Sequence, residues 1–333
     1  MGPLVGKKNN TVEKEKAFLA FIDNVFPLMG PDSLHRGIQL LKDGRIICYC
    51  YSVKIYKYID KNFILDFEFG FEPPIGFEPP ESSSIGSICE IEDNIILIGC
   101  NMKLYLYDIW NKKFLQKISF TNTLVYFTQC IRLSNGLIAT SNRLEIIFYK
   151  YNDKIKKLLK VDEIKNLRGD SKIFEIKNGN IISYYDNELI IYNQNRSIQT
   201  KIIIDNHYVG CSVLDGEYLL ISHNDGSYLN SFVDVYSIKK FKLLQTLGVK
   251  YKLKDFVKLN NNLLVASDEN GNIQEFSIDE NHKLSAKDIF RAHEWIITGM
   301  CKFDDNKLLS ISFDGKAKLW EFNWMINKHK DNN

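Results

Sequence analysis

Residues 301–322 read CKFDDNKLLSISFDGKAKLWEF, and they show the pattern from which the fold can be predicted. The stretch contains three short apolar runs, separated by two turns that are rich in Asp, Asn and Gly. Apolar runs of about four to eight residues, bounded by turn-forming residues, are typical of antiparallel β-strands. The stretch therefore predicts three strands that are joined by tight turns.

The same plan occurs in six further segments of the chain. The first turns of the seven units begin at Asp43, Asp93, Asn135, Asn178, Asp215, Asn261 and Asp305. These turns recur about every 44 residues, and a repeat of about 40–45 residues with four strands per unit is typical of β-propeller blades. We therefore predict an all-β protein, a seven-bladed β-propeller of four-stranded antiparallel blades, with residues 14–326 in one domain.

The last unit, which begins AHEW, resembles a repeat of the WD-repeat (WD40-type) β-propeller family. His293, Ser310, Asp314 and Trp320 stand where that family has its structural hydrogen-bond tetrad. An indole donor, a hydroxyl, an imidazole and a carboxylate can form one continuous chain of hydrogen bonds. In the other six units the Trp position holds Tyr, Phe or Val. The resemblance in periodicity covers residues 36–322, and it implies a closed ring of blades.

The last unit has room for only three strands before the chain ends. We predict that residues 17–29, AFLAFIDNVFPLM, supply the missing strand of blade 7, since closure would remove an open sheet edge. The alternative is an amphipathic helix, because the apolar residues of this segment also recur at helical spacing. Residues 1–13 are predicted to be a disordered tail, and residues 327–333 a second tail.

A duplicated Pro-rich stretch, GFEPPIGFEPPE, begins at Gly70. The interval between the first two units exceeds the average by about the length of one copy. We interpret residues 70–82 as an inserted loop, because the entropy of loop closure grows only with the logarithm of length. The alternative is a binding element, since Phe71 and Phe77 would be two exposed aromatic side chains on a stiff, extended arm.

Composition excludes several classes of function. Lys and Arg number 43 and Asp and Glu 41, so the net charge of +2 gives no electrostatic basis for direct binding to nucleic acid. No apolar run reaches the length of about 18 residues that a membrane span needs, and no signal peptide is recognisable. Seven cysteines without CxxC pairs fit free thiols in a reducing compartment. We expect a cytoplasmic protein, with the nucleus as the alternative, that is monomeric by itself.

The cysteines and histidines do not form a convincing chemical site. Cys89, Cys130, Cys211 and Cys301 fall at near-equivalent positions of four innermost strands, which are spread around the ring and cannot converge on one zinc ion. The sequence contains no HxxxH, HExxH, GxSxG, Walker or GxGxxG pattern. We therefore predict no metal, no cofactor and no catalytic residues, and we expect that the protein is not an enzyme.

One candidate site remains. In WD-repeat propellers, the loops that lead into the innermost strands line the top face, the usual binding surface of that family. In this chain those loops hold His35, Arg36, Arg168, His207, Tyr208, Arg291 and Trp295. Arg and Trp are the residue types that contribute most at interfaces, and a ring of cations would suit an acidic or phosphorylated peptide.

The resemblance and this candidate site together predict a non-enzymatic scaffold that binds peptide segments of partner proteins on its top face. Two alternatives remain open. The first is a small-ligand binder or enzyme that uses the central channel, and the second is a subunit of a larger assembly, such as a nucleic-acid-processing complex. A propeller fold alone does not choose between them, because propellers carry several functions.

Overall fold

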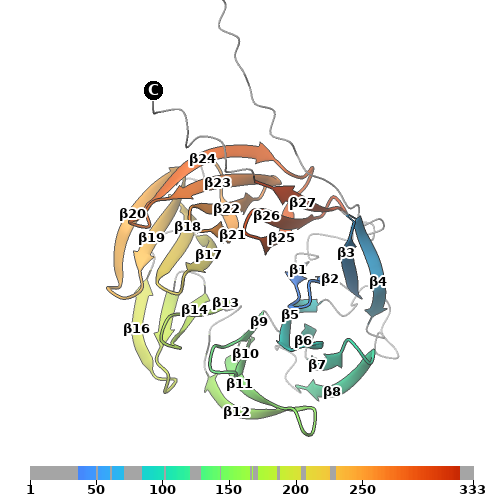
Figure 1. The fold of residues 1–333 in the computed structure, drawn as a ribbon. Coiled ribbons are helices and arrows are strands. Elements are labelled where there is room, and N and C mark those ends of the chain that lie inside the picture. The colour runs from blue at the N-terminus through green and yellow to red at the C-terminus, as the bar shows by residue number, and fades with distance from the viewer. Residues whose placement is uncertain are drawn as a thin grey trace, which may run out of the picture.

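The computed structural model describes residues 37–49, 52–60, 62–70, 85–100, 103–120, 129–142, 144–165, 167, 172–185, 188–203, 208–225 and 230–322. Within these ranges the chain forms 27 β-strands in seven sheets and no helix. Figure 1 shows the sheets arranged as blades around a central axis. The predicted all-β, seven-bladed propeller is therefore confirmed. None of the described segments is a helix long and apolar enough to cross a membrane.

The first four blades follow one another along the chain and have four strands each. Blade 1 consists of β1 (Gly37–Leu40), β2 (Ile46–Tyr49), β3 (Ser52–Ile59) and β4 (Asn62–Gly70). Blade 2 consists of β5 (Ile85–Glu92), β6 (Ile95–Cys100), β7 (Lys103–Asp108) and β8 (Lys113–Ser119). Blade 3 consists of β9 (Gln129–Arg132), β10 (Ile138–Ser141), β11 (Glu145–Asn152) and β12 (Lys157–Lys165). Blade 4 consists of β13 (Lys172–Glu175), β14 (Ile181–Tyr185), β15 (Glu188–Tyr192) and β16 (Ile198–Ile203).

The remaining three blades complete the ring. Blade 5 consists of β17 (Tyr208–Leu214), β18 (Tyr218–Asn224), β19 (Ser231–Ser237) and β20 (Lys242–Val249). Blade 6 consists of β21 (Leu253–Asn260), β22 (Leu263–Asp268), β23 (Asn272–Ile278) and β24 (Leu284–Arg291). Blade 7 has three described strands, β25 (Ile297–Asp304), β26 (Lys307–Ser312) and β27 (Ala317–Glu321). Residues 17–29, the predicted fourth strand of blade 7, lie outside the described residues.

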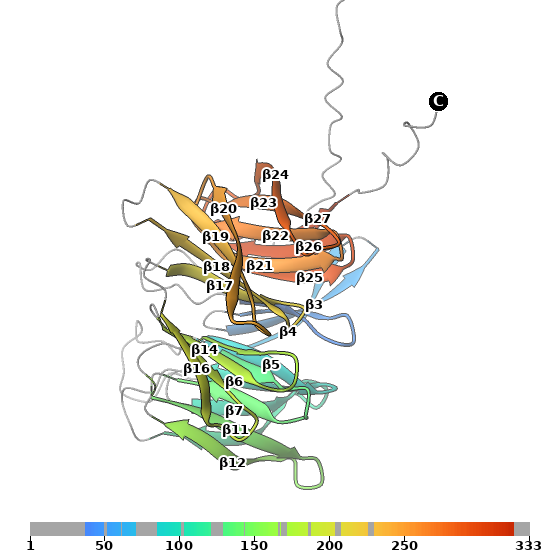
Figure 2. The ribbon, with the colours of Figure 1, turned by 90° about the vertical axis from the view of Figure 1, so that its left-hand side faces the viewer.

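Each blade is an antiparallel meander, and its first strand lies nearest the axis (Figure 1). Because neighbouring strands run in opposite directions, the connections alternate between two faces of the ring, which Figure 2 shows from the side. The top face carries the loops that lead into each first strand and the turns between second and third strands. The bottom face carries the first-to-second and third-to-fourth turns, which include the predicted turn at Asp43, where Gly44 adopts a φ of 84°.

The core consists of seven apolar clusters, one between each pair of neighbouring blades in the described part of the chain. Blade 7 packs against blade 1 in this way, with Ile311 and Leu319 in the same cluster as Ile38 and Ile46. A Cβ atom on Gly299 of blade 7 would lie only 3.2 Å from the backbone of blade 1. Full burial of one such side chain contributes about 1.5–3 kcal/mol, so this packing closes the ring.

One aromatic residue occupies the same register position on the third strand of every blade. In each case it pairs with an Ile or Leu of the second strand, and the set is Tyr56, Tyr107, Tyr149, Tyr192, Tyr236, Phe276 and Trp320. In blades 1 to 5 a β-bulge in the pairing with the fourth strand directly precedes it. The expectation of Val at this position in some units is therefore wrong.

Candidate functional site

The four residues of the predicted tetrad form one chain of hydrogen bonds in blade 7. Trp320 Nε1 donates to Ser310 Oγ at 2.9 Å, and Ser310 Oγ lies 2.7 Å from His293 Nε2. His293 Nδ1 lies 2.9 Å from Asp314 Oδ2. The indole can only donate, so the consistent arrangement has the Ser310 hydroxyl donating to Nε2 and a protonated Nδ1 donating to the carboxylate. The tetrad thus joins β26, β27 and the loop that leads into β25.

The environment of the tetrad keeps its imidazole neutral. Burial lowers the pKa of His293, and this effect outweighs the opposing hydrogen bond to Asp314. Burial also raises the pKa of Asp314, but the hydrogen bonds from His293 and from backbone amides lower it by more. His293 and Ser310 are fully enclosed, so a substrate has no access to them. The tetrad is a structural element.

Residues 291–296, the last residue of β24 and the loop that leads into β25, are held by hydrogen bonds along their length. The guanidinium of Arg291 donates to the carbonyl oxygens of Asn270 and Glu294. The amides of residues 292 and 293 both donate to the carbonyl of Gly271, at 3.0 and 2.9 Å. Gly271 has a φ of 82°, and a Cβ atom there would lie 2.6 Å from the carbonyl oxygen of His293. The loop and the β22–β23 turn are therefore fitted closely to each other.

Trp295 is the large apolar side chain that this loop presents to solvent. Its side chain is 51% exposed, whereas its own carbonyl accepts a hydrogen bond from Ser312 Oγ at 3.1 Å. The following carbonyl, that of residue 296, accepts from the amide of Phe313 at 3.1 Å. Nearby, Lys316 Nζ lies 3.5 Å from a carboxylate oxygen of Glu294. Trp295 thus stands at the top face on backbone that is fixed on both sides.

The structure places only part of the predicted top-face set. Trp295 lies on the loop between β24 and β25, as predicted. Arg291 is the last residue of β24 and Tyr208 is the first residue of β17, so the prediction that these two lie in loops is wrong. The remaining predicted residues of the top face, His35, Arg36, Arg168 and His207, lie outside the described residues. Phe71 and Phe77 of the Pro-rich insertion lie outside them as well. Arg291 has a structural role that the sequence did not predict, because two backbone carbonyls take up its donors.

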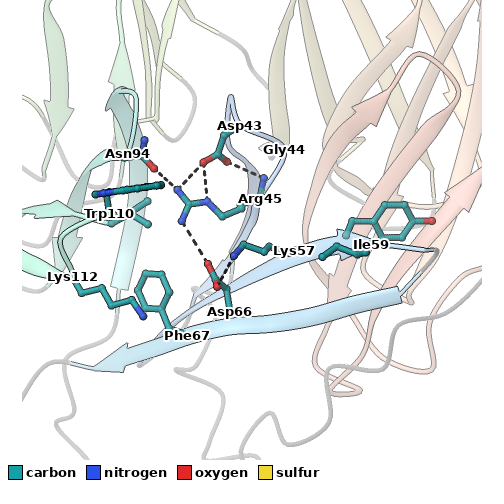
Figure 3. Close-up of a pocket in the computed structure, with 12 residues that line it drawn as sticks. Asp43, Gly44, Arg45, Lys57, Ile59, Asp66, Phe67, Asn94, Trp110 and Lys112 are labelled. Atoms are coloured by element: carbon teal, nitrogen blue, oxygen red, sulfur yellow. Dashed lines mark hydrogen bonds and ion pairs between the residues drawn. The ribbon is translucent and has the colours of Figure 1, made fainter.

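A pocket of about 620 Å³ lies between blades 1 and 2 on the bottom face (Figure 3). Blade 1 supplies Arg45 from the β1–β2 turn and Asp66 from β4. Blade 2 supplies Trp110 and Lys112 from the β7–β8 turn. Sequence reasoning missed this pocket, although one signal was present: a Trp within the short polar turn IWNK, where burial is not expected.

The cysteines of the first strands lie in two different registers, and all of these except the half-buried Cys301 are buried. Cys89 and Cys301 occupy one position of the first strand, whereas Cys130 and Cys211 occupy the next one, so the prediction of near-equivalent positions holds only to within one residue. Because successive side chains point to opposite faces, cysteines of neighbouring blades can meet, as they do in two of the clusters, whereas Cys211 lies in a cluster without a second cysteine. Cys89 and Cys130 share one core cluster, and Cys301 packs against the cluster that contains Cys48. Among the described residues, no group of three or more metal-ligating side chains could hold an ion.

Blade 5 contains a second buried His–Asp pair that the sequence did not reveal. His223 Nε2 lies 3.1 Å from Asp234 Oδ2, and Thr246 Oγ1 donates to the other carboxylate oxygen at 2.6 Å. The contact with Asp234 raises the pKa of His223 and outweighs the effect of burial. Burial raises the pKa of Asp234, but its contacts with His223 and Thr246 lower it by more. The two buried histidines of the described chain are thus shifted in opposite directions.

Comparison with known proteins supports the fold. A scan against models of protein families gives no match, and a search of curated protein sequences gives none either. A chain in the crystal structure of the mitotic checkpoint complex superposes with a TM-score of 0.69 at 11% sequence identity. The alignment covers 97% of this chain and 99% of that chain, so the likeness extends over the whole ring. At 11% sequence identity, this comparison shows a similarity of fold alone.

Proposed function

We propose that this propeller is a non-enzymatic scaffold that binds peptide segments of partner proteins on its top face. The observation that carries the proposal is Trp295, a half-exposed Trp on a loop whose backbone is fixed by hydrogen bonds. Trp is among the residue types that dominate binding energy at protein interfaces. The fold is consistent with this role, since the similar chain comes from the structure of a complex.

The rigidity of the loop favours binding. A contact surface that is ordered before a partner arrives loses less entropy on association than a mobile loop does. Arg291 orders this loop through the carbonyls of Asn270 and Glu294, and Gly271 orders it through two amides. Both hydrogen-bond partners of the guanidinium are neutral carbonyls, so it would contribute Coulombic attraction to an acidic or phosphorylated peptide in addition to its positioning of Trp295.

The proposal extends to the other predicted cations of the top face and to the cellular location. His35, Arg36, Arg168 and His207 precede the first strands of blades 1, 4 and 5 in the sequence, and we propose that they add to the same surface. The described cysteines are free thiols, which suits a reducing compartment, and we propose the cytoplasm or the nucleus.

Affinity capture from native lysate, with mass spectrometry of the retained proteins, tests the top face. Trp295→Ala should lose the partner set that the wild-type protein retains, whereas Ile198→Ala, which removes an exposed apolar side chain from the outer strand of blade 4, should retain it. Arg291→Lys separates two roles of the arginine. Loss of capture would show that the arginine acts by positioning the loop, and retention of capture would show that it acts through its positive charge. Capture of the same partner set by Trp295→Ala and by wild type would contradict the proposal.

A further inference from the structure

The pocket between blades 1 and 2 has a fixed, charged floor. Arg45 donates from Nε to Asp43 Oδ2 at 2.8 Å and also bonds Asn94 Oδ1 across the blade boundary. Its Nη1 lies 3.7 Å from Asp66 Oδ2, and Lys57 Nζ lies 2.8 Å from the other oxygen of that carboxylate. Figure 3 shows this network as one continuous set of contacts. Arg45 thus contacts residues of both blades at the floor of the pocket.

The wall of the pocket is an exposed Trp on a rigid turn. Trp110 is 76% exposed and lies between two anchored neighbours. The amide of Ile109 donates to the carbonyl of Asn94 at 2.8 Å, and the buried Asp108 accepts from the amide and the side chain of Asn111 at 2.9 and 2.8 Å. The indole is therefore held in the solvent by backbone that belongs to blade 2. The exposed indole offers a large, rigid apolar surface of the kind that contributes most to binding at protein interfaces.

Among the charged side chains of the lining, one lysine is available to pair with a ligand. Both carboxylates of the floor, Asp43 and Asp66, already have cationic partners in Arg45 and Lys57. Lys112 lines the pocket from the same β7–β8 turn as Trp110, and its Nζ lies 4.7 Å from the centre of the Phe67 ring. Within the described part of the chain, no carboxylate lies at ion-pair distance from Lys112. The lining thus offers an apolar wall beside a positive charge, and it has no spare negative charge.

We propose that this pocket is a second docking site, which binds a peptide segment of a partner protein in which a bulky apolar side chain stands next to a carboxylate. The apolar side chain packs against Trp110, and the carboxylate pairs with Lys112. A cationic segment is disfavoured, because the acidic groups of the floor are neutralised by their own partners. The site lies on the face opposite Trp295, and it does not depend on the proposed function of the top face. With both sites occupied, the propeller would connect two partners.

Fluorescence anisotropy with two labelled heptapeptide pools tests the proposal. One pool has Leu or Phe at the centre with Asp or Glu on both sides, and the other has the same centre with Lys or Arg on both sides. The wild-type chain should bind the acidic pool and not the basic pool. Trp110→Ala should weaken binding of the acidic pool by about tenfold, the loss expected for removal of one interface Trp. Because the proposed top face would also bind acidic peptides, both pools are compared in a Trp295→Ala background, in which the loss caused by Trp110→Ala should persist.

Charge reversal gives the sharper test. Lys112→Glu should lose the acidic pool and gain the basic pool, whereas Lys117→Glu, an exposed lysine of β8 outside the pocket, should behave as wild type. Equal binding of both pools to the wild-type chain, or wild-type binding by Trp110→Ala and Lys112→Glu, would overturn the proposal. Analytical ultracentrifugation adds one further outcome. A dimer that Trp110→Ala abolishes would show that a second copy of the chain covers the pocket, and the proposed peptide would then be wrong.

Discussion

Ser310 Oγ lies 2.7 Å from His293 Nε2, and both residues are buried in blade 7. The same oxygen accepts the indole proton of Trp320, so this hydroxyl joins the two halves of the tetrad. The equivalent register positions of blades 1 to 6 hold Cys48, Ile98, Thr140, Ser183, Ile221 and Ala266. Blade 7 therefore has a polar element at a position where four of the other blades have an apolar side chain or a thiol.

Replacement of Ser310 by Ala should destabilise the protein by about 1–3 kcal/mol, the cost of leaving buried polar groups without partners. Both His293 Nε2 and Trp320 Nε1 would lose their hydrogen bond in a site that water does not reach. Urea denaturation at constant pH measures the change. Ser277→Ala, which removes an exposed hydroxyl from blade 6, is the matched control and should change stability by less than about 0.5 kcal/mol. Equal effects of the two substitutions would contradict a structural role of the tetrad.

The two buried histidines should give stability opposite dependences on pH. The pKa of His293 is lowered in the folded state, so the unfolded chain takes up this proton first. Its contribution is complete above the ordinary histidine pKa of 6.5 and is lost as the pH falls from 6.5 toward the lower, folded value. The pKa of His223 is raised, so its contribution is complete below 6.5 and is lost as the pH rises through the higher, folded value.

Substitution of each histidine separates these contributions. His293→Gln should flatten the acid side of the profile of stability against pH, and His223→Gln should flatten its alkaline side. Both effects are independent of how far each substitution changes the maximum stability. Urea unfolding midpoints between about pH 5 and pH 8 measure both effects, since histidines titrate in this range and carboxylates do not. An acid side that is unchanged in His293→Gln would show that the loss of stability there comes from other groups.

Periodicity in the sequence was sufficient to predict the ring. Each blade is built from strands that are close in sequence, so the turns at Asp43 and its six counterparts mark the blades directly. The cysteine registers could not be predicted in this way, because a shift of one residue, such as that between residues 85 and 87 of β5, reverses the face to which a side chain points. Spacing along the chain does not record such a shift.

The candidate sites were less predictable than the fold. Trp295 could be placed on the top face, because the loop that holds it leads directly into a first strand. The pocket between blades 1 and 2 could not be predicted, since Arg45 and Trp110 come from turns of two different blades and meet only after the blades pack. The structural role of Arg291 likewise depends on carbonyl groups, which a sequence pattern of side chains does not represent.

The buried thiols should be unreactive in the folded protein. Burial raises the pKa of Cys89, Cys211 and Cys301 to about 12, and it raises the pKa of Cys48 and Cys130 further still. Because the thiolate is the reactive form, alkylation by iodoacetamide at about pH 8 should be slow at these positions and fast in urea. Peptide mapping by mass spectrometry distinguishes the sites. Rapid alkylation of Cys89 in the native protein would contradict its burial between blades 2 and 3.

The spacing between blades 5 and 6 depends on the absence of a side chain at Gly210. A Cβ atom at this position would lie 2.6 Å from the carbonyl oxygen of Leu253 and 2.3 Å from that of Lys254, the next residue of β21. These obstacles are backbone atoms of a neighbouring blade, so they cannot move aside as a flexible side chain would. Gly210→Ala should therefore destabilise the protein by about 1–3 kcal/mol, the usual cost of overpacking.

Gly248 provides the control for this prediction. It lies on β20, the outer strand of the same blade, and a Cβ atom there would meet nothing within 4 Å. Gly248→Ala should leave stability unchanged or raise it by up to about 1 kcal/mol, because alanine restricts the unfolded chain. The midpoints of urea denaturation of the two variants measure the difference. If Gly210→Ala is as stable as Gly248→Ala, blades 5 and 6 can separate to admit a methyl group, and close backbone contact does not fix their spacing.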